Sequence, residues 1–183
     1  TVRFAMDVMS GIPSIVIGIF VYTLVLTLNR QFVFSAVSGG VALAVIMLPV
    51  VARTSEEALR LVPVTTREAA LALGIPKFKV TLRVVLASAR GGLVTGGLLA
   101  VARAAGETAP LIMTAFGNPF GFQGFDHPIA SLTFVIFYYG TSAYENWQGL
   151  AWGATLILIL IMLAISIAAR IALRSRFGSR ENA

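Results

Sequence analysis

The sequence contains no cysteine and few charged residues, and each absence excludes a class of protein or site. Without a thiol, the chain can form neither a disulfide nor a thiolate metal site. Charged residues are 12% of the 183 residues, about half of the roughly 25% that is typical of soluble domains. The one histidine, His127, has no cluster of other metal ligands near it, so we expect no metal site.

Long charge-free segments, by contrast, are abundant, and they decide the class of the chain. No charged residue occurs in residues 8–29, 31–52 or 146–169. The first two segments are each 22 residues long, and a helix of that length extends roughly 33 Å, enough to cross a hydrocarbon core of about 30 Å. The pattern predicts an all-α, polytopic membrane protein with four transmembrane helices, at about residues 10–29, 34–52, 91–116 and 148–170.

Basic residues gather on one side of the predicted membrane. Seven lie between Arg53 and Arg90 and four follow the last predicted helix, whereas residues 115–146 contain none. Because cytoplasmic loops carry an excess of Lys and Arg, we expect the loop 53–90 and the C-terminus to be cytoplasmic and the loop 117–147 to be extracytoplasmic. The rival interpretation, a nucleic-acid-binding patch, does not explain this one-sided placement, so we expect no nucleic-acid partner.

The loop 53–90 carries its own helix signals. A threonine followed three residues later by a glutamate is a capping box, and it occurs at Thr54–Glu57 and at Thr65–Glu68. We expect the first helix to end at Pro63 and the second at Gly74. The short helix predicted over 66–73 either packs on its own spans or presents small and apolar residues to another protein surface, namely Ala69, Ala70, Leu71 and Leu73.

The stretch EAALALGIPKFKVTLRVVLA (68–87) resembles the EAA motif of ABC importer permeases, with its matches at Glu68, Ala69, Ala70 and Gly74. Ala87 replaces the proline that usually follows, so we expect the helix that enters the next span to be less sharply broken.

The resemblance implies that this short helix docks on an ATP-binding subunit, through Glu68, Ala69, Ala70, Leu71 and Gly74. The chain has no Gly-x-x-x-x-Gly-Lys-Ser/Thr loop. We therefore expect it to bind no cofactor and to have no catalytic residues or enzymatic activity of its own, with ATP and Mg²⁺ on the partner.

The stretch ARAAGETAPLI (102–112) places two opposite charges, Arg103 and Glu107, inside an apolar run. A charge at the centre of a membrane helix costs about 2.5–3.5 kcal/mol on insertion scales. On a helix the pair shares one face with Gly92, Gly96 and Ala100. The two glycines favour close helix packing.

Pro110 has no N–H group, so we expect it to distort the helix near Gly106, next to the two charges.

Two interpretations of the charged pair remain open. Arg103 and Glu107 either neutralise each other, in the weaker orientation of such a pair, or line a polar pathway. A guanidinium offers five donors in a planar fork suited to oxyanions, which favours a tetrahedral anion as cargo. Glu107 would then hold the arginine, tune the field or select the protonation state of the anion.

Four segments together resemble the A-type permease subunit of bacterial phosphate ABC importers: GIPSIVIGIF (11–20), ALAVIMLPVVARTSEEALRLVP (42–63), ARAAGETAPLIMTAF (102–116) and LAWGATLIL (150–158). The resemblance implies a type I ABC importer permease fold in the bacterial inner membrane, with a cytoplasmic coupling helix between the second and third spans. It also implies that Arg103 and Glu107 lie on the translocation pathway and that about two spans of the full subunit precede this chain.

The partners implied by the resemblance are a second permease subunit, ATP-binding subunits and an extracytoplasmic phosphate-binding protein. Two alternatives are a permease for another oxyanion, such as sulfate or molybdate, and a secondary anion carrier or channel that does not use ATP. The segment from Arg103 to Glu107 argues against the first alternative, and the docking helix argues against the second.

The predicted extracytoplasmic loop contains one further apolar run, at 129–139. Eleven residues are too few to span a membrane, so we expect a re-entrant or interfacial helix there, beginning at His127.

Overall fold

The computed structural model describes the backbone of residues 2–177 and side chains as far as Ile167. Its regular structure is helical, with one isolated parallel β-bridge between Phe116 and Ile129. The helices are α1 (Val2–Gly11), α2 (Ser14–Leu28), the 3₁₀ turn η1 (Arg30–Phe32), α3 (Ala36–Arg60), α4 (Val64–Ala72), α5 (Lys77–Lys79), the π turn η2 (Val80–Val85), α6 (Leu86–Ala105), α7 (Ala109–Thr114), α8 (Leu132–Gly140) and α9 (Glu145–Phe177).

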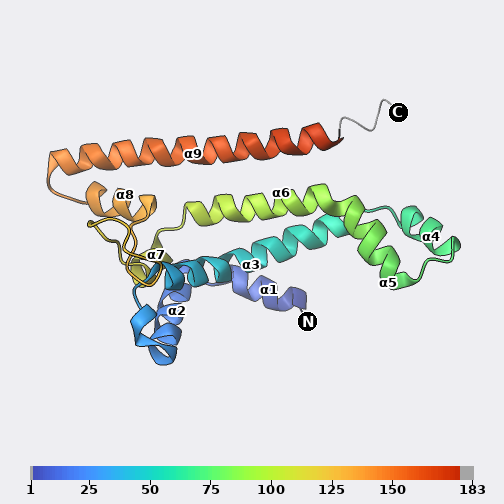
Figure 1. Cartoon of the computed structure of the whole chain (residues 1–183), viewed down its shortest axis with the longest axis horizontal. Helices are drawn as coiled ribbons and strands as arrows, with labels where there is room; N and C mark the ends of the chain where they lie inside the picture. The colour runs from blue at the N-terminus through green and yellow to red at the C-terminus, as the bar shows by residue number, and fades with distance from the viewer. Residues whose placement is uncertain (1, 178–183) are drawn as a thin grey trace.

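The long helices α3, α6 and α9 run along the longest axis of the molecule (Figure 1). One end of this bundle carries α4 and α5, and we call it the α4 end. The opposite end carries α7, α8 and the loop between them, and we call it the α8 end. Among the described residues, three helices are long and apolar enough to cross a membrane: Ala36–Arg60, Lys77–Ala105 and Glu145–Ile167.

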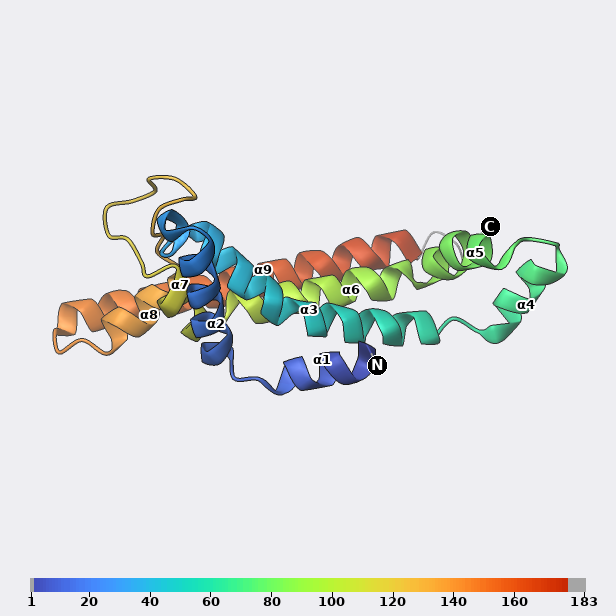
Figure 2. The same cartoon turned by 90° about the horizontal axis from the view of Figure 1, so that it is seen from below.

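The first predicted span, 10–29, differs from the continuous helix that we expected. The chain bends by 103° between α1 and α2, and α2 crosses the direction of the bundle (Figure 2). The break lies at Ile12–Pro13, because a proline disfavours helical geometry in the residue before it. Pro13 is the N-cap of α2, with an extended ψ of 135°. The described part of the chain therefore has three candidate spans, or four if the bent pair counts as one.

Both predicted capping boxes are wrong. Helix α3 begins after Ser35, whose hydroxyl accepts the Ser38 N–H at 3.1 Å, and it continues to Arg60. Thr54 therefore lies inside α3, where its hydroxyl donates to the Val50 carbonyl at 2.8 Å. Helix α4 begins after Pro63, which pre-sets the backbone for a helix start without any side-chain cap, so Thr65 has no capping role.

Gly74 ends α4 in a left-handed conformation, with φ of +75°. Its N–H donates to the Leu71 carbonyl at 2.9 Å, and the Ile75 N–H donates to the Ala70 carbonyl at 3.4 Å. This pair of bonds is a Schellman motif. Helix α5 then continues through the π turn and α6 as one helix of 29 residues, so the helix is not interrupted at Ala87.

Small residues bring α3 and α6 close together. A Cβ atom added to Gly92 would lie 2.6 Å from Cβ of Ala58, and one added to Gly96 would lie 2.3 Å from Oγ1 of Thr54. Next to these contacts, toward the α4 end, lies an apolar cluster, which we call the alanine–valine cluster: Ala58, Val62, Ala70, Val80, Val85 and Ala89.

Ala70 is 7% exposed, so the expectation that it faces a partner surface is wrong. Helical periodicity turns it inward while Ala69 and Leu71 stay exposed.

Large apolar side chains cover the outside of α9, including Leu156, Ile159, Leu160 and Leu163, all more than half exposed. Such a surface suits lipid or a neighbouring membrane helix rather than water.

Candidate functional site

The segment that carries the two charges is a break between helices. Helix α6 ends at Ala105 and α7 starts at Ala109, so the predicted span 91–116 is interrupted. The Gly106 N–H donates to the Arg103 carbonyl and the Glu107 N–H to the Ala104 carbonyl, both at 3.1 Å, in the tighter spacing of a 3₁₀ turn. Pro110 lies in the first turn of α7, where its missing N–H is tolerated.

At this break the two opposite charges face each other loosely. Nε of Arg103 lies 3.8 Å from Oε1 of Glu107, and the side chains are 56% and 18% exposed. That distance exceeds a hydrogen bond, and Arg103 makes no other ion pair within residues 2–167. The guanidinium therefore keeps donors for a further group, while the partly buried carboxylate limits the local positive charge.

Helix α7 is fixed between α2 and the start of α3. Gly18 allows this approach, since a Cβ there would lie 2.7 Å from Cα of Pro110. The buried Thr114 hydroxyl donates to the Pro110 carbonyl at 2.7 Å, and the Thr114 carbonyl accepts the Ser35 N–H at 3.0 Å. These two bonds satisfy the Thr114 hydroxyl, the Thr114 carbonyl and the Ser35 N–H. The roles of Thr114 and Ser35 could not be predicted from the sequence, because a single hydroxyl gives no periodic signal.

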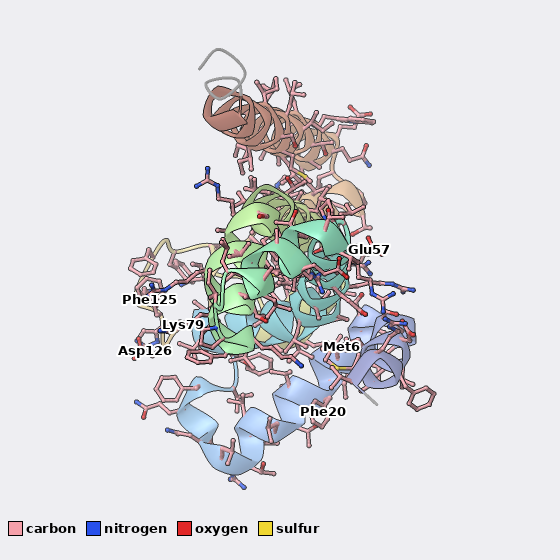
Figure 3. The ribbon with its side chains drawn as sticks, turned by 90° about the vertical axis from the view of Figure 1, so that its right-hand side faces the viewer. Met6, Phe20, Glu57, Lys79, Phe125 and Asp126 are labelled. Atoms are coloured by element: carbon pink, nitrogen blue, oxygen red, sulfur yellow. The ribbon has the colours of Figure 1, made fainter. Side chains whose placement is uncertain are left out.

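The loop before α8 caps the start of α3. The Ala36 N–H donates to the His127 carbonyl at 3.2 Å, and the Val37 N–H to the Phe125 carbonyl at 3.1 Å. Phe125 and the neighbouring Asp126 project to one side of the helices (Figure 3). His127 lies in this loop and not at a helix start, so that expectation is wrong. Helix α8 begins at Leu132, because Ser131 rather than His127 supplies the N-cap.

Helix α8 has 9 residues and packs on the start of α9, which agrees with a short helix in the apolar run 129–139. Aromatic side chains line this contact, with the ring centres of Tyr139 and Trp147 5.0 Å apart. Beside it lies a largely apolar pocket of about 480 Å³, whose lining includes Phe116, Phe134 and Tyr138.

At the α4 end, one polar contact joins α4 to α3. Nη2 of Arg67 donates to the Leu59 carbonyl at 2.8 Å. This contact satisfies a carbonyl in the last turn of α3, where intrahelical donors run out. Glu68, Ala69 and Leu71 remain exposed beside it, and Leu73 is 80% exposed. From the sequence, Arg67 contributed only to the predicted topology, and this role was not predicted.

Ionic contacts also join α1 to the end of α3. Arg3 binds the carboxylate of Glu56, which also accepts from Arg60 at 3.1 Å, and Nη1 of Arg53 lies 3.3 Å from Oδ1 of Asp7. These side chains surround an open cavity of about 1040 Å³. Figure 3 shows Met6 of α1 and Glu57 of α3 on the same side of the molecule.

The sequence profile of the family described as "Binding-protein-dependent transport system inner membrane component" matches residues 1–177. Among curated proteins, the chain is similar to the "Phosphate transport system permease protein PstA" of Xylella fastidiosa (strain 9a5c), with 50% identity over 92% of this chain and 58% of that protein. The corresponding protein of Yersinia pestis is 44% identical, over 92% of this chain and 57% of that protein. The chain thus spans a little more than half the length of these relatives.

A relative from Mycobacterium tuberculosis (strain ATCC 25618 / H37Rv), "Phosphate transport system permease protein PstA 1", is 42% identical over 91% of this chain and 54% of that protein. These matches confirm the resemblance to phosphate importer permeases that the four segments indicated. Among solved structures, the inward-facing MetNI methionine ABC transporter matches with a TM-score of 0.74, 20% identity and coverage of 93% of this chain and 72% of that chain. The fold is therefore that of an ABC importer permease.

Proposed function

Because the chain belongs to the family of inner membrane components of binding-protein-dependent transport systems, we propose that it is a permease subunit of an ATP-driven importer of inorganic phosphate. The observation that carries this proposal is the pair Arg103 and Glu107 at the break between α6 and α7. It occurs in a chain that is 50% identical to a phosphate transport permease over 92% of its length.

Arg103 supplies the chemistry that a phosphate ion needs. Its guanidinium offers a planar fork of donors to two oxygens of a tetrahedral anion, and its side chain is only loosely paired. Glu107 stands 3.8 Å away and repels the same anion. A pathway residue must bind strongly enough for the ion to enter and weakly enough for it to leave. Attraction by Arg103 and repulsion by Glu107 together keep the binding of the anion moderate.

The chain forms half of the translocation pathway in this proposal, and a second permease subunit forms the other half. Separate ATP-binding subunits bind ATP and Mg²⁺ and dock on α4, where Glu68, Ala69 and Leu71 are exposed and Gly74 closes the helix. An extracytoplasmic phosphate-binding protein delivers the ion to the α8 end. The chain itself holds no cofactor and catalyses no reaction.

The α4 end and the C-terminus lie in the cytoplasm, and the protein resides in the bacterial inner membrane. What supports this orientation is the charge distribution. The seven basic residues between Arg53 and Arg90 are on the side of α4, whereas residues 115–146 of the opposite end contain neither Lys nor Arg. The excess of positive charge on cytoplasmic segments sets the topology of such chains.

The test is uptake of radiolabelled phosphate by proteoliposomes that contain the full-length assembled complex, with and without ATP inside. We expect uptake that requires ATP and the binding protein and that excess sulfate or molybdate does not suppress. Suppression by either oxyanion would favour the alternative cargo. Uptake by this subunit without ATP would overturn the importer and favour a secondary carrier.

A further inference from the structure

The carbonyl group of Glu107 has an unusual hydrogen-bond partner. It lies before α7, whose ladder begins with the Ile112 N–H donating to the Thr108 carbonyl at 3.1 Å. The Glu107 carbonyl instead accepts the Thr133 hydroxyl at 3.2 Å, across 26 residues of sequence. Thr133 is 6% exposed, so its hydroxyl needs a partner within the protein. It takes the place of the helix N–H that would donate to the Glu107 carbonyl if the helix were not broken.

Thr133 is itself oriented by Ser131. The two hydroxyl oxygens are 3.1 Å apart, and Ser131 also accepts the Phe134 N–H at 3.1 Å as the N-cap of α8. A threonine hydroxyl has one hydrogen, which here goes to the Glu107 carbonyl. Ser131 must therefore donate to Thr133. The result is a directional chain of bonds from the first turn of α8 through two hydroxyls to the backbone of Glu107.

We infer that Thr133 is a positioning residue for Glu107: through Ser131 it joins α8 to the break and fixes where the Glu107 carboxylate stands relative to Arg103. This inference rests on the proposed function, since it concerns the same pair of charges. The carboxylate is attached to the residue whose carbonyl Thr133 holds, and it lies 3.8 Å from Nε of Arg103. A shift of that backbone changes the spacing of the two charges and hence the attraction for an anion.

The experiment compares Thr133→Val, which keeps the shape and removes the hydroxyl, with Thr133→Ser, which keeps the hydroxyl. Phosphate uptake by the full-length assembled complex is measured over a range of phosphate concentrations. We expect Thr133→Val to lower uptake about fivefold at unchanged complex yield, the loss of one buried hydrogen bond. Thr133→Ser should restore uptake to within about twofold of wild type.

Thr141→Val is the matched control, because the Thr141 hydroxyl bonds only within its own helix, to the Phe137 and Tyr138 carbonyls. We expect wild-type uptake from it. Equal impairment by Thr133→Val and Thr141→Val, or by Thr133→Val and Thr133→Ser, overturns the inference. If Thr133→Val does not assemble, Ser131→Ala takes its place, and unchanged uptake in that variant overturns the inference in the same way.

Glu107→Gln in the same series separates the two proposals. Loss of uptake in Glu107→Gln with normal uptake in Thr133→Val overturns the positioning role and leaves the phosphate importer standing. A wild-type complex that takes up no phosphate overturns the importer. The positioning role is then judged by the distance between spin labels at Val101 and Phe137, two exposed sites on α6 and α8. The distribution of distances between the two labels should be broader in Thr133→Val than in wild type and as narrow as wild type in Thr133→Ser. An unchanged distribution in both variants overturns the positioning role.

Discussion

At the α4 end, the contacts between elements are mainly apolar: the alanine–valine cluster lies between α3, α4, η2 and the start of α6. Arg67 adds one polar contact, to the Leu59 carbonyl. At the α8 end, Ser35, Thr114 and Thr133 are buried and donate or accept across element boundaries. Apolar packing is non-directional, whereas a hydrogen bond fixes distance and angle. Non-directional apolar contacts therefore dominate at the first end, and directional hydrogen bonds between elements dominate at the second.

The largest effect is expected from Ala70→Glu, which tests the apolar character of the α4 end. Ala70 is 7% exposed within the alanine–valine cluster, so a carboxylate there should lower the free energy of unfolding by about 3 kcal/mol or more. Thermal unfolding of the detergent-solubilised protein measures it. The exposed neighbour Ala69→Glu should unfold like wild type, and equal loss in both variants would show that the cluster does not hold this end.

A smaller effect is expected where α3 and α6 touch. In Gly96→Ala the new Cβ would lie 2.3 Å from Oγ1 of Thr54, so the helices must separate, at about 1–3 kcal/mol of stability. In Gly97→Ala the new Cβ meets nothing within 4 Å, and the gain in helix propensity should stabilise slightly. Unfolding midpoints of the two variants that move together would contradict the close contact.

The smallest effect is expected from the polar contact at the α4 end. Arg67→Ala removes the donor to the Leu59 carbonyl, which should cost about 1–2 kcal/mol of local stability. Faster amide hydrogen exchange in residues 59–72 than in the wild type is the expected result. Arg83→Ala is the control, because Arg83 is exposed on η2. Faster exchange in the control alone would contradict a role for Arg67.

The sequence predicted the helical class, the family resemblance and three of the long helices, because charge-free length and periodicity depend on local composition. It did not predict that Pro13 bends the first predicted span by 103°, or that α3 continues past Thr54 to Arg60. A capping-box pattern also fits a helix interior, and only the surrounding packing distinguishes the two.

In the candidate site, too, some residues could be predicted from the sequence and others could not. The pair Arg103 and Glu107 stood out because two charges in an apolar run are costly. Thr133 and Ser131 did not, since hydroxyls on a short helix have no pattern that points to a carbonyl 26 residues earlier. Arg67 was visible only as a charge. Contacts between segments far apart in the chain require the folded structure.

We propose that Arg103 serves the passage of phosphate, and phosphate uptake by the full-length assembled complex carrying Arg103→Gln tests this role. We predict that uptake falls by at least about tenfold, the loss of a charge-assisted contact, while complex yield stays that of wild type. Arg90→Gln, at an exposed position nearer the α4 end, should transport normally. Wild-type uptake in Arg103→Gln would contradict the claim and make the pair of charges purely structural.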